Sequence, residues 1–338
     1  MRETFDVAVV GASGMIGEAM MSILEERDFP IRNIYPLGSE RSAGSTLQFR
    51  DQPVKVGLLS EFDFSRVQYG LFSAGASVSD VYARKAVEQG CTVIDNTSRF
   101  RYEPEVPLVV PEVNADVLTE EDQLIANPNC STIQMVVALK PIYDAVGIER
   151  INVCTYQSVS GAGRSAVHEL ANQSAALLNG KPIETEVAPR QIAFNAIPHI
   201  DVFQENGYSK EEMKMVWETR KLLRDETIRV NPTTVRIPVF FGHSEAVHIE
   251  TRDKLTAADA RELLQQAKGV TVIDDPQALL YPTAVTEAAN RDDVFVGRIR
   301  EDISHDLGLN LWIVSDNVRK GGALNTIQIA EYLIDSTV

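Results

Sequence analysis

The sequence predicts an α/β protein with two parts, a doubly wound parallel sheet followed by an α+β part whose sheet is mixed or antiparallel. Short apolar strands alternate with helices over the first 127 residues, and a glycine-rich turn follows the first strand. Longer strands replace this pattern after residue 150, and 322–334 has the spacing of one amphipathic helix that packs back on the first part. We expect domains at 1–127 plus 317–338 and at 128–316.

The first strand, 5–10, leads into the turn 11–17 (Gly-Ala-Ser-Gly-Met-Ile-Gly), and helical spacing continues to Arg27. Glycines allow a tight turn and a close approach of the backbone to a ligand, and a helix N-terminus attracts a pyrophosphate. The spacing differs from the commonest Gly-x-Gly-x-x-Gly pattern, and the alternative is a plain tight turn. Its place after the first strand favours a dinucleotide site of the Rossmann type.

The second strand, 31–37, ends in a loop that contains Arg41 and Ser42. A site for NAD normally has an acidic residue about 20 residues after the glycine turn, which holds the ribose 2′-hydroxyl. Only Glu40 is acidic in this loop. Because arginine pairs bidentately with phosphate, the loop favours NADP. The alternative is a solvated arginine.

The remaining elements continue the two patterns. In the first part we expect strands at 70–74, 91–96, 108–110 and 123–126, with a helix at 80–89 that ends at Gly90. In the second part we expect strands at 150–158, 234–241, 245–251 and 308–314, and helices near 162–179, 210–227 and 257–267.

Composition excludes several classes of protein. A net charge of −16 over 338 residues argues against nucleic acid as a partner but leaves small anionic ligands open. No apolar run approaches the ~20 residues of a membrane span, and Glu3 and Asp6 do not suit a signal peptide. Three cysteines are too few for a disulfide framework. We expect a cytoplasmic protein without a bound metal.

The segment 127–132 (Asn-Pro-Asn-Cys-Ser-Thr) joins a short strand to an apolar helix that is expected to end at Pro141. Cys130 then lies at or beside the helix N-terminus, where backbone N–H groups and the helix dipole favour a thiolate. A helix terminus supplies about 0.3–1 kcal/mol, occasionally 2, and lowers a thiol pKa by about one, so a nucleophile needs a partner such as histidine. The alternative is a buried cysteine without a function, which is our expectation for Cys91 and Cys154.

Two of the five histidines lie beside a strand break at Gly242. His243 follows the glycine, and His248 falls on the other face of a regular strand. Either suits acid–base chemistry. The spacing does not choose between them, and a histidine in such a place is more often structural.

Several motifs together resemble the aspartate-semialdehyde dehydrogenase family over nearly the whole chain. They are Gly11–Gly17, Asp95–Arg99, Asn127–Cys130, Gln157–Gly163, Glu218–Lys221, Arg236–Ser244 and Asp316–Gly321. Met15 and Ile16 differ from the small residue and Val that are frequent in the family's glycine turn. Arg220 stands where one branch of the family commonly has Asn. None of the three has a catalytic role.

The resemblance implies roles for individual residues. Cys130 is the nucleophile and His243 the acid or base. Gln157, Glu218 and Arg236 bind the substrate, and Arg99, Asn129 and Lys221 bind its phosphate. NADP contacts Gly11, Ser13, Gly14, Met15, Ile16, Arg41, Ser42, Ser160, Gly161 and Asn317.

The chemistry of the charged residues agrees with these roles. Glu218 and Lys221 share one helix face, although an exposed ion pair is the alternative. Arg236 in a mostly apolar strand needs an anion. Arg99 follows the carboxyl end of a strand, where open α/β sheets bind ligands. Arg101 shares its face in an extended chain, and the resemblance makes Arg101 the surface residue.

The implied reaction is the reversible, NADPH-dependent reductive dephosphorylation of L-4-aspartyl phosphate to L-aspartate 4-semialdehyde through a thioester on Cys130. This reaction belongs to the biosynthesis of diaminopimelate, lysine, threonine and methionine, and the family forms homodimers or homotetramers. One alternative is an N-acetylglutamyl-phosphate reductase-like enzyme, whose acylated substrate nitrogen does not need Glu218. The other is a non-catalytic homologue that acts as a binding protein, which should have lost Cys130 or His243.

Overall fold

The computed structural model describes residues 3–336 and divides into two compact units. One unit contains the chain up to Pro128 together with the segment from Gly322, and the other is Asn129–Gly321. From the sequence, we expect divisions after residues 127 and 316. None of the helices in the described residues combines the length and the apolar character that a bilayer crossing requires.

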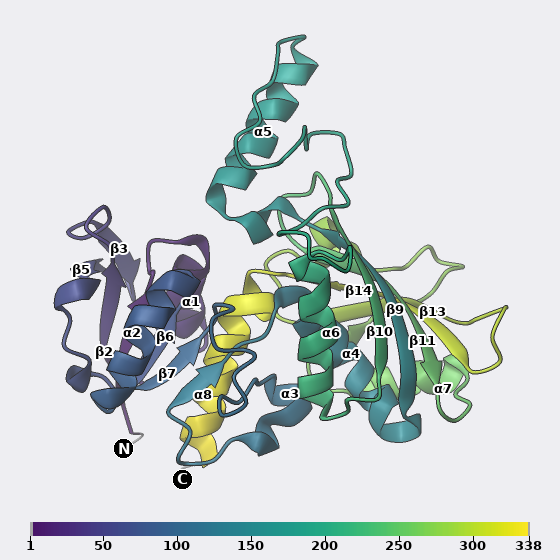
Figure 1. Ribbon diagram of the computed structural model, residues 1–338, viewed down its shortest axis with the longest axis horizontal. Helices are drawn as coiled ribbons and strands as arrows, with labels where there is room; N and C mark the ends of the chain where they lie inside the picture. The colour runs from purple at the N-terminus through teal and green to yellow at the C-terminus, as the bar shows by residue number, and fades with distance from the viewer. Residues whose placement is uncertain (1–2, 337–338) are drawn as a thin grey trace. The chain divides into compact units, whose positions relative to one another are not determined.

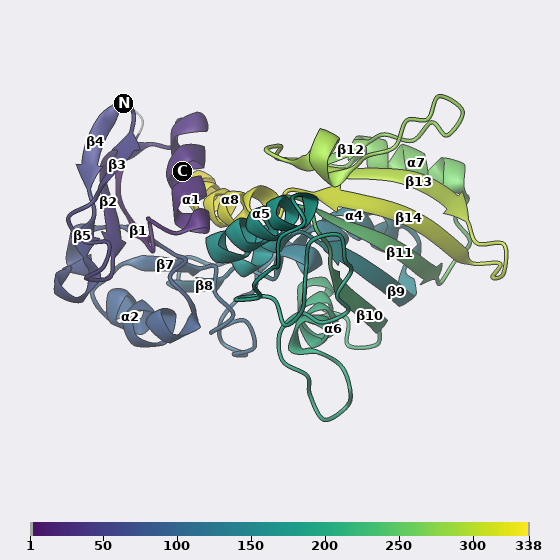
Figure 2. The ribbon, with the colours of Figure 1, turned by 90° about the horizontal axis from the view of Figure 1, so that it is seen from above.

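The first unit contains a parallel six-stranded sheet in the order β5-β2-β1-β6-β7-β8 (Figure 1). Helices α1 (Met15–Glu26) and α8 (Leu324–Ser336) lie on one side of it and α2 (Ala76–Glu88) on the other (Figure 2). The strands are β1 (Phe5–Val10), β2 (Ile31–Gly38), β5 (Gly57–Leu58), β6 (Tyr69–Phe72), β7 (Thr92–Asp95) and β8 (Leu124–Ala126). This is the doubly wound sheet that the alternating strands and helices predict.

The core of this unit joins the two ends of its sequence. Val7 and Val9 of β1 are fully buried because helices cover both faces of the sheet. Leu324 and Ile327 of α8 belong to the same cluster of buried side chains, which confirms that the final helix packs on the first unit. Beside this core are a hairpin of β3 (Thr46–Phe49) and β4 (Gln52–Lys55) and the short helix α3 (Pro111–Asn114).

The strand expected at 108–110 is absent from the described sheet, where Leu108 forms only an isolated bridge with Ala126. Pro107 and Pro111 flank this segment. Prolines lack the N–H that a strand ladder requires, so the segment cannot extend into a regular strand.

The second unit contains a mixed six-stranded sheet in the order β10-β9-β11-β14-β13-β12 (Figure 2). Strands β9 and β10 are parallel, as are β12 and β13, and the other pairs are antiparallel. The strands are β9 (Ile148–Gln157), β10 (Arg229–Arg236), β11 (His243–Thr251), β12 (Val270–Val272), β13 (Val294–Glu301) and β14 (Gly308–Ser315). The sequence did not predict β12 or β13.

Helices α4 (Cys130–Val146), α6 (Lys210–Leu223) and α7 (Ala257–Gln266) pack against this sheet, and α5 (Arg164–Leu178) completes the unit. Along β11, His243 is buried and His248 is half-buried, as expected for opposite faces.

Three expectations about this unit and its cysteines were wrong. The strand expected at 234–241 ends at Arg236, because Pro238 cannot join a strand ladder. Helix α4 continues through Pro141 instead of stopping there. Most of its side chains are buried, and this packing outweighs the about 3 kcal/mol that an interior proline costs. Cys91 is buried as expected, whereas Cys154 is only half-buried.

Candidate active site

The glycine turn between β1 and α1 leaves no room for side chains. Gly11 has a φ of +87°, and a Cβ at this position would lie 2.9 Å from the backbone nitrogen of Ala74. A Cβ on Gly17 would lie 2.2 Å from the carbonyl oxygen of Gly11. Within the described chain no side chain caps α1 at Gly14, so N–H groups of its first turn remain available to a phosphate. The turn therefore fits a dinucleotide pyrophosphate.

The other nucleotide residues of the first unit lie at the same edge of its sheet. Val10 of β1 is paired with Leu37 of β2, so both strands end together. Ser13, Met15 and Ile16 are half-buried at the start of α1, and the loop after β2 contains exposed Arg41 and half-buried Ser42. Ligands of open parallel sheets bind outside these carboxyl ends, which fits the expected use of this loop.

Two carboxylates already bind Arg99, which follows β7. Its guanidinium donates hydrogen bonds to Asp80 and to Glu103, the latter at 2.6 Å, and both carboxylates raise its pKa. The Arg99 side chain is 35% exposed. Arg99 therefore forms surface ion pairs, as a solvated arginine would. Because carboxylates already bind its guanidinium, Arg99 is less suited to bind a phosphate.

Arg101 is the buried arginine of this loop, so the expectation that it lies at the surface was wrong. Its Nε and Nη2 atoms donate to the carbonyls of Thr97 and Asn96, both at 3.0 Å. The loop is anchored by Asp95, which accepts hydrogen bonds from Ser79 and Thr97. Burial raises the pKa of Asp95. Arg101 is therefore buried in the loop, whereas the Arg99 side chain is 35% exposed.

In the second unit, Cys130 is the first residue of α4, which confirms its position at a helix N-terminus. Asn129 is the N-cap, and its Oδ1 accepts from the backbone nitrogens of Ser131 (3.1 Å) and Thr132 (3.3 Å). A Cβ on Gly321 would lie 2.7 Å from the Cβ of Cys130, so only glycine fits beside the thiol. The cap orients the turn that carries the sulfur.

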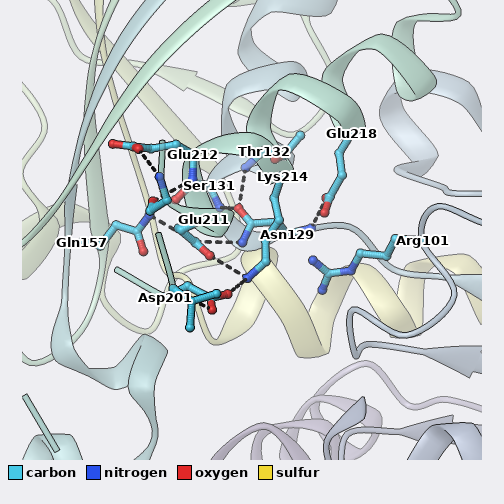
Figure 3. A network of polar contacts seen from close by, with 12 residues as sticks. Arg101, Asn129, Ser131, Thr132, Gln157, Asp201, Glu211, Glu212, Lys214 and Glu218 are labelled. Carbon is cyan, nitrogen blue, oxygen red and sulfur yellow. Dashed lines mark hydrogen bonds and ion pairs between the residues drawn. The ribbon is translucent and has the colours of Figure 1, made fainter. Parts of the chain in front are cut away.

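A buried carboxylate from α6 lies next to this cap (Figure 3). Glu211 accepts hydrogen bonds from the side-chain amides of Asn129 (2.9 Å) and Gln157 (3.3 Å) and from Lys214 Nζ (2.9 Å). Burial raises the pKa of Glu211, but Lys214, Asn129 and Arg236 lower it to about 2. Glu211 is therefore an ionised carboxylate that the sequence reasoning missed.

The last residue of β10, Arg236, is paired in register with Gln157 of β9. Its Nη1 donates to the carbonyl of Ser158 at 2.6 Å, and within residues 3–336 its guanidinium has no ion pair. Burial lowers the pKa of Arg236, whereas the charges of Glu211 and Cys130 raise it. A buried cation near the thiol is a site for an anionic group of a ligand.

His243, the first residue of β11, is fully buried. Its Nδ1 accepts from the backbone nitrogen of Ser158 at 3.1 Å and lies 3.1 Å from the Ser158 hydroxyl. Burial and the charge of Arg236 lower the pKa of His243 to about 3, although Glu211 opposes this. A Cβ on Gly161 would lie 3.4 Å from His243 Nε2 and 2.9 Å from Arg236 Nη1, so Gly161 keeps the space beside both groups open.

Two residues expected to contact the cofactor, Ser160 and Asn317, are buried and bonded to each other. Asn317 Oδ1 also accepts from the backbone nitrogen of Gly242 and lies within hydrogen-bond distance of the Ser158 hydroxyl. These side chains therefore bond the Ser158 hydroxyl, which lies next to the His243 ring.

Glu218 occupies a different place from Glu211. It lies seven residues later, two turns along the same face of α6, and accepts from the backbone nitrogen of Asn129 at 2.5 Å. Lys221 comes three residues after Glu218, and Lys214 comes three residues after Glu211. The sequence therefore contains two Glu-x-x-Lys pairs. This repetition could have identified Glu211 and Lys214 as candidates alongside Glu218 and Lys221. Only Glu211 reaches Gln157 among the hydrogen bonds of the described residues.

Comparison with known families agrees with this architecture. The family model described as "Semialdehyde dehydrogenase, NAD binding domain" matches residues 6–121, and "Semialdehyde dehydrogenase, dimerisation domain" matches residues 139–320. The chain is 62% identical over 335 residues to the aspartate-semialdehyde dehydrogenase of Legionella pneumophila, covering 98% of this chain and 96% of that protein. It belongs to the aspartate-semialdehyde dehydrogenase family. The resemblance deduced from the motifs is thereby confirmed.

Solved structures of aspartate-semialdehyde dehydrogenases share the fold. Aspartate semialdehyde dehydrogenase II of Vibrio cholerae, complexed with ASA, has a TM-score of 0.97 and 55% identity, covering 99% of this chain and 100% of that one. The enzyme of Candida albicans with NADP has a TM-score of 0.77, with 98% of each chain covered, and at 24% identity it shows the fold alone. The family's NAD binding and dimerisation domains are thus both present here.

Proposed function

We propose that this enzyme catalyses the reversible, NADPH-dependent reductive dephosphorylation of L-4-aspartyl phosphate to L-aspartate 4-semialdehyde. The observation that carries the proposal is the thiol of Cys130 at the N-terminus of α4, in a unit that also holds buried Arg236, Glu211 and His243 close to one another. Membership of the family and the high identity to named aspartate-semialdehyde dehydrogenases support it.

The substrate's two charged groups on its α-carbon match two buried side chains. Arg236 binds the α-carboxylate, because it is a buried cation without an ion pair in the described residues. Glu211, rather than Glu218, binds the α-amino group, since it is ionised and lies beside Gln157. Gln157 orients the acyl group. An ionised amine-binding carboxylate also supports this substrate over an N-acetylglutamyl phosphate, whose nitrogen is acylated.

The phosphate requires cationic partners, and each unit offers one that suits it better than the residue first expected. In the first unit we assign this role to Arg101 in place of Arg99, because Arg101 is buried whereas the Arg99 side chain is 35% exposed. In the second unit we assign it to Lys214 in place of Lys221, because Lys214 pairs with Asp201 and with Glu211, the carboxylate that also bonds Gln157. Asn129 acts chiefly as the helix cap, because its amide is already bonded at both ends.

The reaction begins when the Cys130 thiolate attacks the acyl phosphate carbonyl and phosphate departs, leaving a thioester on the sulfur. Backbone N–H groups at the start of α4 stabilise the oxyanion. NADPH, when bound, supplies the hydride that reduces the thioester. His243 presents Nε2 toward the space beside Gly161 and assists as the hemithioacetal collapses to the aldehyde and the thiolate re-forms.

The cofactor choice follows from the loop after β2. Ser13, Gly14, Met15 and Ile16 form the pyrophosphate turn, and Arg41 with Ser42 recognises the 2′-phosphate of NADP. In the second unit, Gly161 leaves room for a ligand, and the neighbouring Ser160 bonds Asn317.

The enzyme acts in aspartate-derived amino-acid biosynthesis as a cytoplasmic homodimer or homotetramer. The dimerisation domain and the presence of a free catalytic thiol, which needs a reducing compartment, support this. The deciding assay is phosphate-dependent reduction of NADP+ with aspartate semialdehyde. Activity that requires phosphate supports the function; activity only with N-acetylglutamate semialdehyde, or with neither aldehyde, refutes it.

A further inference from the structure

Behind His243 lies a buried row of hydrogen-bonding groups that extends to Asn317. The Asn317 Nδ2 atom lies 3.0 Å from the Ser160 hydroxyl. The Ser160 and Ser158 hydroxyls are 3.0 Å apart, and the Ser158 hydroxyl lies 3.1 Å from His243 Nδ1. All four side chains are at least 95% buried. Water therefore does not compete for these groups, and their bonds depend on one another.

The contacts at the two ends of this row both suit one direction of hydrogen bonding. At one end, the Gly242 backbone nitrogen donates to Asn317 Oδ1 at 3.0 Å, which orients the Asn317 NH2 group as the donor toward Ser160. At the other end, the Ser158 backbone nitrogen donates to His243 Nδ1 at 3.1 Å. A backbone N–H only donates, so Nδ1 must present a lone pair. In this direction the Ser160 hydroxyl accepts from Asn317 and donates to Ser158, whose hydroxyl donates to His243 Nδ1.

We propose that Asn317, Ser160 and Ser158 form a directed chain of hydrogen bonds that holds His243 as the neutral tautomer protonated at Nε2. Ser158 is its central positioning residue, because its N–H and its hydroxyl both bind Nδ1 while its carbonyl holds Arg236. The tautomer follows from the backbone N–H of Ser158, which donates to Nδ1. Its catalytic meaning rests on the proposed function.

The consequence concerns the direction of proton traffic. A ring with Nδ1 occupied by donors offers Nε2–H to the space beside Gly161, so His243 donates a hydrogen bond to sulfur or oxygen there. It cannot take a proton from Cys130 before the attack unless the Ser158 bond breaks. The charges of Arg236 and Glu211 act on the ring in opposite directions, and Cys130 interacts with Arg236. The His243 ring can therefore stay neutral beside these groups.

The alternative arrangement has both hydroxyls donating to Asn317 Oδ1, which lies 3.0 Å from Ser158 Oγ and 3.2 Å from Ser160 Oγ. In that case only the backbone N–H would bind Nδ1. The two arrangements give the same tautomer but differ in whether the Ser158 hydroxyl reaches the ring. A variant at Ser158 therefore separates them.

The test is 15N NMR of the histidine rings in the ligand-free enzyme, with the His243 signals identified by their loss in His243→Asn. We expect Nε2 protonated and Nδ1 unprotonated, with no titration between about pH 5 and 8, where an ordinary histidine titrates. Ser158→Ala should move the Nδ1 signal because one of two donors is lost. A ring protonated at Nδ1, or an Nδ1 signal that Ser158→Ala leaves unchanged, would overturn the chain.

A second variant reverses the chain without changing its shape. Asn317→Asp replaces the donating NH2 with an acceptor and adds a charge three hydrogen bonds from the ring along the chain. We expect the pKa of His243 to rise by about 1–3, and an unchanged pKa contradicts the directed chain. Ser315→Ala is the matched control, because Ser315 is paired with His243 across the sheet and its hydroxyl has no partner in the described chain. None of these signals depends on the identity of the substrate.

Discussion

Glu211 and Glu218 bind the same residue, Asn129, from positions two turns apart on one face of α6. Glu211 accepts from its side-chain amide at 2.9 Å, and Glu218 accepts from its backbone nitrogen at 2.5 Å. Glu211 continues to Gln157, whereas Glu218 fixes the backbone just before Cys130. The two carboxylates therefore make different contacts, Glu211 with two side-chain amides and Glu218 with a backbone nitrogen.

The first prediction distinguishes these carboxylates. Glu211→Gln should lower kcat/KM for aspartate semialdehyde by about 10–150-fold, because it removes a charged hydrogen bond worth about 1.5–3 kcal/mol. Glu218→Gln keeps an acceptor for the Asn129 nitrogen and should change kcat/KM by less than about threefold. Steady-state kinetics of both variants, with urea unfolding to check their stability, decide the matter. A larger loss in Glu218→Gln would restore the role first expected for it.

The second prediction concerns the arginines after β7. Arg101→Ala should raise the KM for phosphate more than about tenfold, which corresponds to about 1.4 kcal/mol. Arg99→Ala should have little effect, because exposed ion pairs contribute about 0–1 kcal/mol. Initial rates at varied phosphate with saturating aldehyde and NADP+ measure both. An equal effect of the two substitutions would show that burial does not identify the phosphate ligand.

The reasons why sequence reasoning found some of these residues and not others are physical. The glycine turn and the position of Cys130 depend on a strand, a turn and a helix adjacent in sequence, so local patterns were sufficient. Glu211 and Glu218 share one face of α6 and the same spacing to a lysine. Which of the two meets Gln157 depends on how α6 packs against the sheet, and no local pattern contains that information.

The loop after β7 shows the same limit. Arg99 and Arg101 share a face only in an extended chain, but Asp95 binds Thr97 through both its nitrogen and its hydroxyl and bends the loop. The turn between Asp95 and Thr97 therefore determines which of the two arginines is buried. The proline effects were similar in kind. Pro141 did not end α4 because buried side chains surround it, whereas Pro238 beyond β10 had no such packing to offset its missing N–H.

The third prediction concerns cofactor choice. Arg41→Ala should raise the KM for NADPH by about tenfold or more while leaving the KM for NADH nearly unchanged, because only NADPH has the 2′-phosphate that the guanidinium binds. Kinetics with both cofactors provide the comparison, and Arg50→Ala, in the neighbouring hairpin, is a control for loss of surface charge. Equal effects on both cofactors would remove Arg41 from the recognition of NADP.

The fourth prediction is a dependence of stability on pH. The pKa of His243 is about 3 in the folded enzyme but about 6.5 when unfolded, so the unfolded chain binds the extra proton between these values. This residue therefore lowers the free energy of unfolding by about 1.4 kcal/mol per pH unit as the pH falls from about 6 toward 3. Urea unfolding of the enzyme and of His243→Asn should show a smaller loss in the variant. Identical pH profiles would mean that the ring is not buried as a neutral group.

The most direct measurement is mass spectrometry of the enzyme quenched after incubation with aspartyl phosphate without NADPH, together with the activity of Cys130→Ala. We predict an aspartyl thioester on Cys130 that disappears when NADPH is added, and complete loss of phosphate-dependent NADP+ reduction in Cys130→Ala with NADPH binding retained. Ser131→Ala, which removes a buried hydroxyl without a partner in the described chain, should stay active. Turnover by Cys130→Ala, or an acyl group on any other residue, would contradict the nucleophile.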